Sequence, residues 1–343
     1  MLYSSAPLTF ILRAATLLAW LSLAVACTQS AKPGLPDSPL GGGARQARGT
    51  TPLPAAAIPR PPVSANPGVP GNQPSATPQL SGHLPLQGTK LQQELDSFVA
   101  GLAGTYGVVA YSFSTGEEIA INESELFPAA SLYKLIVLYE AYRQVEAGEM
   151  SLTTPLQILP QHLVEADSSD LSGGEWLSLA DALRLMTTFS SNAAAYAVLD
   201  EVGWQRFNDA AVELGLTETM IAMGNTVELQ PEWRRDTAST SPRDMLRFFE
   251  LLSRRQLVNA SASDAMLGLL LDQQVNDRIP AGLPDSVLIA HKTGELDGVR
   301  NDAGIIFTES NTYILVVLSM GADTDEEVAA IAQIARLVQA RFG

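Results

Sequence analysis

Residues able to form disulfides or to bind transition metals are scarce in this sequence. Its 343 residues include one cysteine and three histidines, and a single cysteine allows no disulfide within the chain. Cys27, His83, His162 and His291 lie far apart, without the CxxC or HExxH spacing that gathers zinc ligands. We therefore expect neither a metal site nor a cofactor.

Positive charge is also scarce. The chain has 21 lysines and arginines against 37 aspartates and glutamates, which gives a formal net charge of -16. Nucleic-acid binding requires clustered Lys and Arg to neutralise phosphates, so no nucleic-acid partner is expected. Apolar residues make up 46% of the chain and charged residues 17%, a composition that excludes disorder throughout.

The N-terminal hydrophobic run is too short to cross a membrane. Residues 14–26, AATLLAWLSLAVA, follow Arg13 and end in small residues, whereas a spanning helix needs about 20 apolar residues. This pattern predicts a secretion signal over residues 1–26. Residues 23–27, LAVAC, resemble the lipobox of bacterial lipoproteins, which implies an exported, membrane-anchored protein lipidated at Cys27. The alternative is a plain signal peptide with an incidental cysteine on a secreted or periplasmic protein.

Residues 27–88 have the composition of a linker. They contain 13 of the 21 prolines of the chain and a GGG triplet, and they show no apolar periodicity that would build a core. We therefore expect a single folded domain over residues 89–343, held at a distance from its anchor.

The apolar pattern of residues 89–343 predicts an α+β fold. A β-hairpin is expected around Ser114-Thr115-Gly116, followed by a mostly helical stretch over residues 131–275. The far end of the chain predicts three more strands and a final helix, at 285–294, 301–307, 312–320 and from Asp325. These elements predict an antiparallel five-stranded sheet built from both chain ends and flanked by helices, with a mainly helical insert.

Lysine is used sparingly in this domain, which has arginine at nearly all other basic positions. Beyond Lys90 the domain has only Lys134 and Lys292, and lysine, unlike arginine, can lose its proton and act as a base. Lys134 lies three residues after Ser131, on the same helical face. A serine at a helix start also has free backbone N–H groups and a favourable dipole for a developing oxyanion, although such a serine is more commonly an N-cap.

Three short motifs follow one another in the sequence: Ser131-x-x-Lys134, Ser190-x-Asn192 and Lys292-Thr293-Gly294. In this order they resemble the signature of class A β-lactamases and penicillin-recognising serine enzymes. The neighbouring segments FPAAS at 127–131, RDT at 235–237, TSPRDM at 240–245 and HKTG at 291–294 are also similar to class A sequences. The resemblance covers residues 89–343.

The resemblance implies a role for each motif residue. Ser131 would be the acylated nucleophile and Lys134 its base or proton relay. Ser190 would pass a proton to the leaving nitrogen, beside the positive potential of Lys292. Asn192 would bind the side-chain amide of the substrate, and Thr293 and Gly294 would lie at the strand that binds its carboxylate. The backbone N–H groups of Ser131 and Glu295 would form the oxyanion hole. Arg300 would be either a second carboxylate anchor or a solvated arginine.

Two departures from the family pattern concern catalysis. Ser191 replaces the usual aspartate of Ser-Asp-Asn. The loop before Asp236 lacks the Glu-x-x-Leu-Asn pattern whose glutamate activates the deacylating water, and Glu228 is the better substitute by position.

These observations predict a serine β-lactamase that hydrolyses the β-lactam amide and confers antibiotic resistance. One alternative is a penicillin-binding protein or peptidoglycan DD-peptidase that acts on stem peptides and deacylates slowly. Another is a non-catalytic surface lipoprotein. A hydrolase based on His291 is disfavoured because adjacent strand residues face opposite sides. We expect a monomer whose only membrane contact is the lipid anchor.

Overall fold

The computed structural model describes residues 90–163, 171–221 and 238–343. The predicted signal, linker and lipidated Cys27 lie outside the described residues, and so does the loop that contains Glu228. No helix in the described ranges is both long and apolar enough to cross a membrane.

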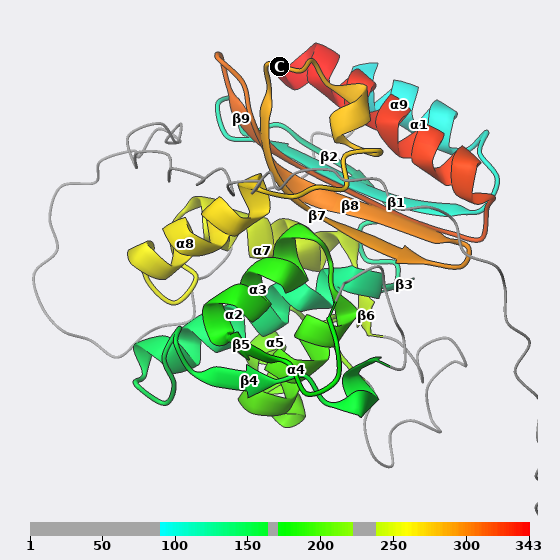
Figure 1. Cartoon of the computed structure of the whole chain (residues 1–343). Helices are drawn as coiled ribbons and strands as arrows, with labels where there is room; N and C mark the ends of the chain where they lie inside the picture. The colour runs from blue at the N-terminus through cyan, green and yellow to red at the C-terminus, as the bar shows by residue number, and fades with distance from the viewer. Residues whose placement is uncertain (1–89, 164–170, 222–237) are drawn as a thin grey trace, which may run out of the picture. The chain divides into compact units, whose positions relative to one another are not determined.

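A five-stranded antiparallel sheet is formed by the two ends of the domain, as the sequence predicted. Its strand order is β2-β1-β9-β8-β7. The strands are β1 (Thr105–Ser112), β2 (Glu118–Ile121), β7 (Leu288–Leu296), β8 (Val299–Phe307) and β9 (Thr312–Met320). The N-terminal strand β1 therefore lies beside the last strand, β9, and β7 forms one edge of the sheet (Figure 1).

Helices cover both faces of the sheet. On one face lie the first and last helices, α1 (Lys90–Val99) and α9 (Thr324–Phe342), and on the other lies α7 (Pro242–Ser253) (Figure 1). The three central strands β1, β8 and β9 are buried along nearly their whole length. Strands buried on both faces read as continuous apolar runs, which is why the sequence made them easy to locate.

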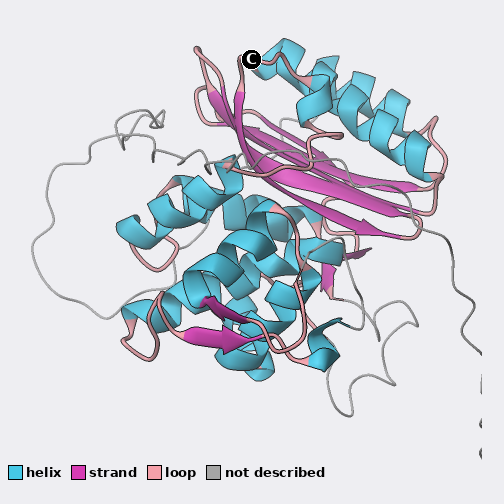
Figure 2. Ribbon diagram, in the orientation of Figure 1, coloured by secondary structure: helices cyan, strands magenta, loops and turns pink. Residues whose placement is uncertain are grey.

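The middle of the chain forms the helical part, separate from the sheet in the ribbon view (Figure 2). Its elements are the 3₁₀ turn η1 (Ala130–Tyr133), α2 (Lys134–Glu146), the turn η2 (Pro160–Leu163), α3 (Leu179–Thr188), α4 (Asn192–Val202), α5 (Trp204–Glu213) and α8 (Ala260–Leu271). The turn η4 (Pro280–Gly282) instead packs against α9. The helical pattern over 178–203 is two helices, since Ser190 and its neighbours break the run between α3 and α4.

Four short strands were not predicted from the sequence. β3 (Phe127–Pro128) pairs with β6 (Ser239–Thr240), and β4 (Pro155–Gln157) pairs with β5 (Trp176–Ser178). Strands of two or three residues are too short to show alternation. The β3–β6 pair leads directly into η1 and so helps to place Ser131.

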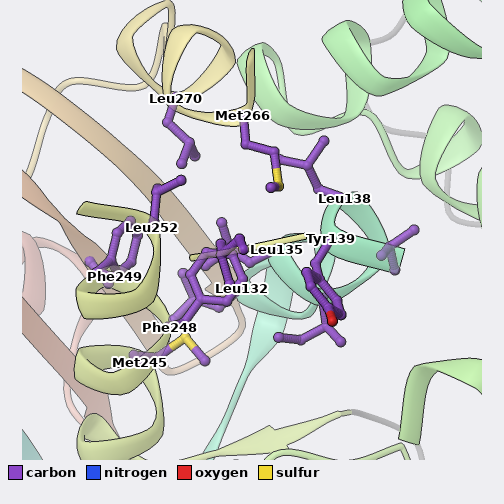
Figure 3. Close-up of a cluster of buried hydrophobic side chains, with 14 of the residues drawn as sticks. Leu132, Leu135, Leu138, Tyr139, Met245, Phe248, Phe249, Leu252, Met266 and Leu270 are labelled. Atoms are coloured by element: carbon purple, nitrogen blue, oxygen red, sulfur yellow. The ribbon is translucent and has the colours of Figure 1, made fainter. Parts of the chain in front are cut away.

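Two apolar cores stabilise these layers. One fills the space between the sheet and α1 and α9, and the larger one joins the sheet to the helical part. In the larger core, side chains of α2 such as Leu135 and Leu138 gather with Phe248 and Met245 of α7 and Met266 of α8 (Figure 3). Because α2 is buried on nearly every side, its first turn is held rigidly against the sheet.

Candidate active site

The backbone before Ser131 makes a sharp turn. Ala129 N donates a hydrogen bond to Ala238 O at 2.7 Å, and Ala130 then adopts a positive φ of 46°. A non-glycine residue in this region stores about 1 to 3 kcal/mol of strain, which surrounding structure must offset. Ser131 follows, half-buried, inside η1 and one turn before α2. It is not the N-cap of α2, a position held by Tyr133.

Lys134 joins the first two motifs. Its side chain is 1% exposed. The Nζ atom donates to Ser190 O at 2.5 Å and to Asn192 Oδ1 at 2.7 Å, and it lies 3.4 Å from Ser190 Oγ. Ser131 is three residues earlier on the same turn, so the amine stands between the predicted nucleophile and the Ser-x-Asn motif.

Ser190 also contacts the third motif, through Lys292. It lies between α3 and α4 with a φ of 61°, a second strained non-glycine position. Lys292 of β7 donates from Nζ to Ser190 Oγ at 2.9 Å and to Thr293 O at 2.8 Å. The Ser190 hydroxyl thus contacts both lysines, and the structure brings Lys134, Ser190 and Lys292 together from three segments of the chain, with Ser131 three residues before Lys134.

Lys292 is fully buried, and this controls its protonation. Burial, reinforced by the positive charges of Lys134 and Arg278, holds its pKa well below the usual lysine range, against the opposing effect of Asp302. Two ammonium groups and a guanidinium so close together disfavour one another's charge.

Gly294 lets β7 approach the nucleophile turn. A Cβ atom there would lie 2.9 Å from Ala129 O and 3.1 Å from Ala130 Cβ, so a side chain would push the strand away. Because β7 is an edge strand, alternate backbone groups along it face away from β8. This arrangement places the backbone of Glu295 next to the turn that contains Ser131.

Asn301 of β8 fixes the same turn, and sequence reasoning did not identify it. Its Nδ2 atom donates to Pro128 O at 2.9 Å and to Ala129 O at 3.2 Å, while its Oδ1 accepts from Ser319 N. The side chain is fully buried. Asn301 stands between Arg300 and Asp302 in the polar first half of β8, so no pattern in the sequence singled it out.

Arg278 is a second residue that sequence reasoning missed. Its side chain is 1% exposed, and Nη2 donates to Glu295 Oε2 at 2.8 Å. Nε and Nη1 have no hydrogen-bond partner among the described residues, although Nε lies 3.6 Å from Asp277 Oδ1. A lone arginine in an irregular segment carries no sequence signal, because its position depends on long-range packing.

Arg300 is buried, so it is not a solvated surface arginine. Nη1 donates to Leu296 O and Val299 O, and Nη2 to Thr324 Oγ1 at 3.1 Å. These contacts tie its guanidinium to the β7–β8 turn and to α9, and its role as a carboxylate anchor stays a prediction.

Two other residues are explained by local contacts. Ser191, which replaces the family's aspartate, caps α4 by accepting from Ala194 N at 3.2 Å. His291 contacts Asp302 at 2.8 Å and Asn276 at 3.2 Å. It therefore stands apart from the Ser190 cluster, as strand alternation predicted. The described residues contain no group of three or more His, Cys, Asp or Glu that could hold a metal ion.

Glu228 and the segment 235–237 lie outside the described residues, but the flanks of their loop are well placed. Met220 and Ser239 exchange two backbone hydrogen bonds of 3.1 and 2.9 Å. Asn208 holds Ile221 through both its backbone groups at 2.9 Å. On the other flank, Ala238 is bonded to Ala129, two residues before Ser131. The loop thus starts and ends beside the nucleophile turn.

Comparison with known proteins gives consistent results. A model of the family described as "Beta-lactamase enzyme family" matches residues 90–342. A β-lactamase of Streptomyces albus G is 27% identical over 259 residues, covering 69% of this chain and 80% of that protein. One from Streptomyces fradiae is 24% identical over 273 residues, covering 74% of this chain and 87% of that protein.

Solved structures are similar over the same region. PBP-A superposes with a TM-score of 0.69 at 25% identity, covering 76% of this chain and 97% of that one. A β-lactamase from Sphaerobacter thermophilus gives a TM-score of 0.65 at 26% identity, covering 74% and 97%. A PBP-A mutant solved as an acyl-enzyme complex with penicillin G also superposes at 0.69, with 25% identity and coverage of 76% and 98%.

Proposed function

Since this chain belongs to the beta-lactamase enzyme family, we propose that it is a serine hydrolase that opens the amide bond of β-lactams through an acyl-enzyme on Ser131. The observation that carries the proposal is the convergence of two buried lysines on Ser190, one turn from Ser131. Such a cluster of buried basic groups around hydroxyls serves proton transfer rather than folding stability.

Acylation begins when Ser131 Oγ attacks the lactam carbonyl carbon. The hydroxyl proton passes to Lys134, which must be neutral to accept it. A neutral amine still has two N–H bonds, enough for the contacts with Ser190 O and Asn192 Oδ1, and it keeps its lone pair for this proton. The resulting oxyanion is stabilised by the backbone N–H groups of Ser131 and Glu295.

Breakdown of the tetrahedral intermediate breaks the lactam C–N bond. The departing nitrogen takes the proton of Ser190 Oγ, which recovers a proton from Lys134 at 3.4 Å. Lys292, which donates to the same hydroxyl at 2.9 Å, stabilises the transient negative charge on Ser190. Acylation therefore leaves an ester on Ser131 and an amine on the opened ring, and each proton is accounted for.

Substrate binding uses the free edge of β7. Asn192, whose Oδ1 accepts from Lys134, would bind the side-chain amide of the substrate. Thr293 lies on the edge strand beside Lys292 and would donate to the substrate carboxylate. Arg278 donates a hydrogen bond to Glu295 of β7, and its positive charge would attract the same carboxylate.

The deacylation rate decides between a β-lactamase and a penicillin-binding protein or DD-peptidase. The similarity to PBP-A and the absence of the Glu-x-x-Leu-Asn pattern give the second candidate only weak support. The similarity to curated β-lactamases favours the first. A non-catalytic lipoprotein would have no reason to keep two buried lysines.

A paired measurement tests the proposal: turnover of a chromogenic cephalosporin, and intact mass after exposure to penicillin. Rapid turnover without a lasting adduct is expected for the β-lactamase, whereas a persistent adduct supports the penicillin-binding alternative. Ser131→Ala should abolish both signals while its circular dichroism and melting temperature stay near those of the wild type. Unchanged labelling of that variant would remove the mechanism.

We also infer that the enzyme acts outside the cytoplasm, anchored through Cys27. The support is the sequence alone: a short apolar run, small residues before the cysteine and a proline-rich linker.

A further inference from the structure

The pair formed by Arg278 and Glu295 is unevenly exposed. The arginine side chain is 1% exposed and the glutamate side chain is 61% exposed, although Nη2 and Oε2 are only 2.8 Å apart. Water therefore reaches the carboxylate but not the guanidinium. Glu295 can rotate into solvent at little cost, whereas Arg278 cannot move away from its place.

Arg278 is also incompletely satisfied. Nε and Nη1 make no hydrogen bond to any described residue. A buried donor without an acceptor lowers the stability of the folded protein, and does so more when the group is charged. The two unpaired donors of Arg278 indicate that a bound ligand supplies the missing acceptor. Burial lowers the pKa of Lys292, and the nearby positive charge of Arg278 contributes to the same shift.

Glu295 lies on the face of β7 that carries Thr293, since residues two apart on a strand point the same way. Its partner across the ladder is Arg300, which reaches Oε1 at 3.3 Å. One exposed carboxylate is therefore held between two buried arginines, next to the threonine proposed to bind the substrate's carboxylate.

We propose that the Glu295 side chain is a built-in occupant of the arginine subsite and competes there with the carboxylate of the substrate. An incoming anionic substrate must displace or share the glutamate, and the two carboxylates repel each other. Glu295 thereby sets the preference of the enzyme between anionic and neutral substrates, acting through Arg278. The proposal rests on the proposed function and extends it to substrate selectivity.

The test compares a penicillin with its own methyl ester, which has the same ring and side chain but no charge. The second-order rate of acylation is measured for each by intact-mass quenching, and the ratio of acid to ester is the readout. For Glu295→Gln we expect this ratio to rise about two- to fivefold, since a charge pair with an exposed partner is worth at most about 1 kcal/mol. A damaged oxyanion hole would slow both compounds and cancel in the ratio.

Matched variants complete the experiment. Glu295→Asp keeps the charge and should keep the ratio near that of the wild type. Arg278→Gln should lower the ratio, and adding Glu295→Gln to it should change the ratio little further. An unchanged or lower ratio in Glu295→Gln, with adducts forming normally, overturns the inference alone. Absence of both adducts and turnover with both compounds in the wild type overturns the proposed function and the inference with it.

Discussion

Two lysines meet at one hydroxyl on Ser190, and they cannot both carry a proton without cost. Lys292 is fully buried, and Lys134 is buried and within 3.4 Å of the same oxygen. This crowding favours loss of a proton from one of the two amines. At Lys134, arginine would hold its charge permanently and would block proton transfer.

Lys134→Arg should lower the acylation rate about 10² to 10⁴-fold, the usual contribution of a general base, even though the positive charge is kept. The measurement is single-turnover acylation by a chromogenic cephalosporin. Lys90→Arg, an exposed position at the start of α1, is the matched control and should keep the full rate. Retention of most of the rate in Lys134→Arg would show that only positive charge is needed.

The lowered pKa of Lys292 predicts that the rate of acylation falls at alkaline pH. Burial, Lys134 and Arg278 lower its pKa, so it loses its charge as the pH rises through a value well below the usual lysine pKa of about 10.4. The rate of acylation should fall across that range, because the positive potential on Ser190 disappears. Lys292→Arg cannot lose its proton and should abolish this limb of the pH profile at a reduced maximum rate. The same limb in the variant would assign it to another group.

The lowered pKa of Lys292 also affects stability. The unfolded chain binds this proton more readily than the folded chain between the lowered pKa and about 10.4. The contribution of Lys292 to stability is therefore present above the unfolded value and is lost as the pH falls through the folded value.

At the scale of elements, the periodicity of apolar residues predicted the long strands and helices. It did not predict the short strands and buried polar residues whose positions depend on long-range packing. The β1–β2 hairpin, the strands β7 to β9 and helix α9 follow patterns of apolar residues, and the structure confirms them. The short pair β3–β6 and the buried Arg278 depend on segments that meet only in the folded chain. The motif serines and lysines could be identified in the sequence, but their convergence on Ser190 required the coordinates.

Asn301 should matter to both stability and rate, because it joins β8 to the segment before Ser131. Asn301→Ala leaves Pro128 O, Ala129 O and Ser319 N without this partner, at about 1 to 3 kcal/mol for each group left buried and unpaired. We expect a lower denaturation midpoint and slower acylation. Ser310→Ala, which removes exposed hydrogen bonds to Gly343 O and Thr308 Oγ1, is the control and should change stability by about 0.5 kcal/mol at most. Equal midpoints in both variants would contradict the positioning role.

The loop between Ile221 and Ala238 should control the second step of the reaction. Pre-steady-state traces with a chromogenic cephalosporin should show a burst and then a slower phase, because the family's usual loop glutamate is displaced. Glu228→Gln should lower the steady rate about 10² to 10⁴-fold and leave the burst amplitude nearly intact. Glu232→Gln, in the same loop, should alter neither. Fast linear turnover in the wild type would mean that deacylation is fully competent.

At the scale of the whole molecule, the N-terminal segment predicts where the enzyme works. The full-length protein should sediment with membranes, because a lipid on Cys27 supplies the apolar attachment that a 13-residue run cannot. Cys27→Ser should release it, and Thr28→Ser should not, as judged by fractionation and immunoblotting. A wild type recovered only as a soluble species beginning near residue 27 would indicate simple secretion.

The pairing of β1 with β9 has a consequence for how the chain reaches its native state. Ser112 and Asn311, hydrogen-bonded at the end of this pair, are 199 residues apart in sequence. Closing so large a loop costs entropy before any contact rewards it, so this topology has a high contact order and folds slowly. Until β9 has left the ribosome, β1 and β2 are only an isolated hairpin, which is marginally stable in water. The sheet is therefore completed only after β9 has been synthesised, and β7 gains its place against the Ser131 turn only when the last strand arrives.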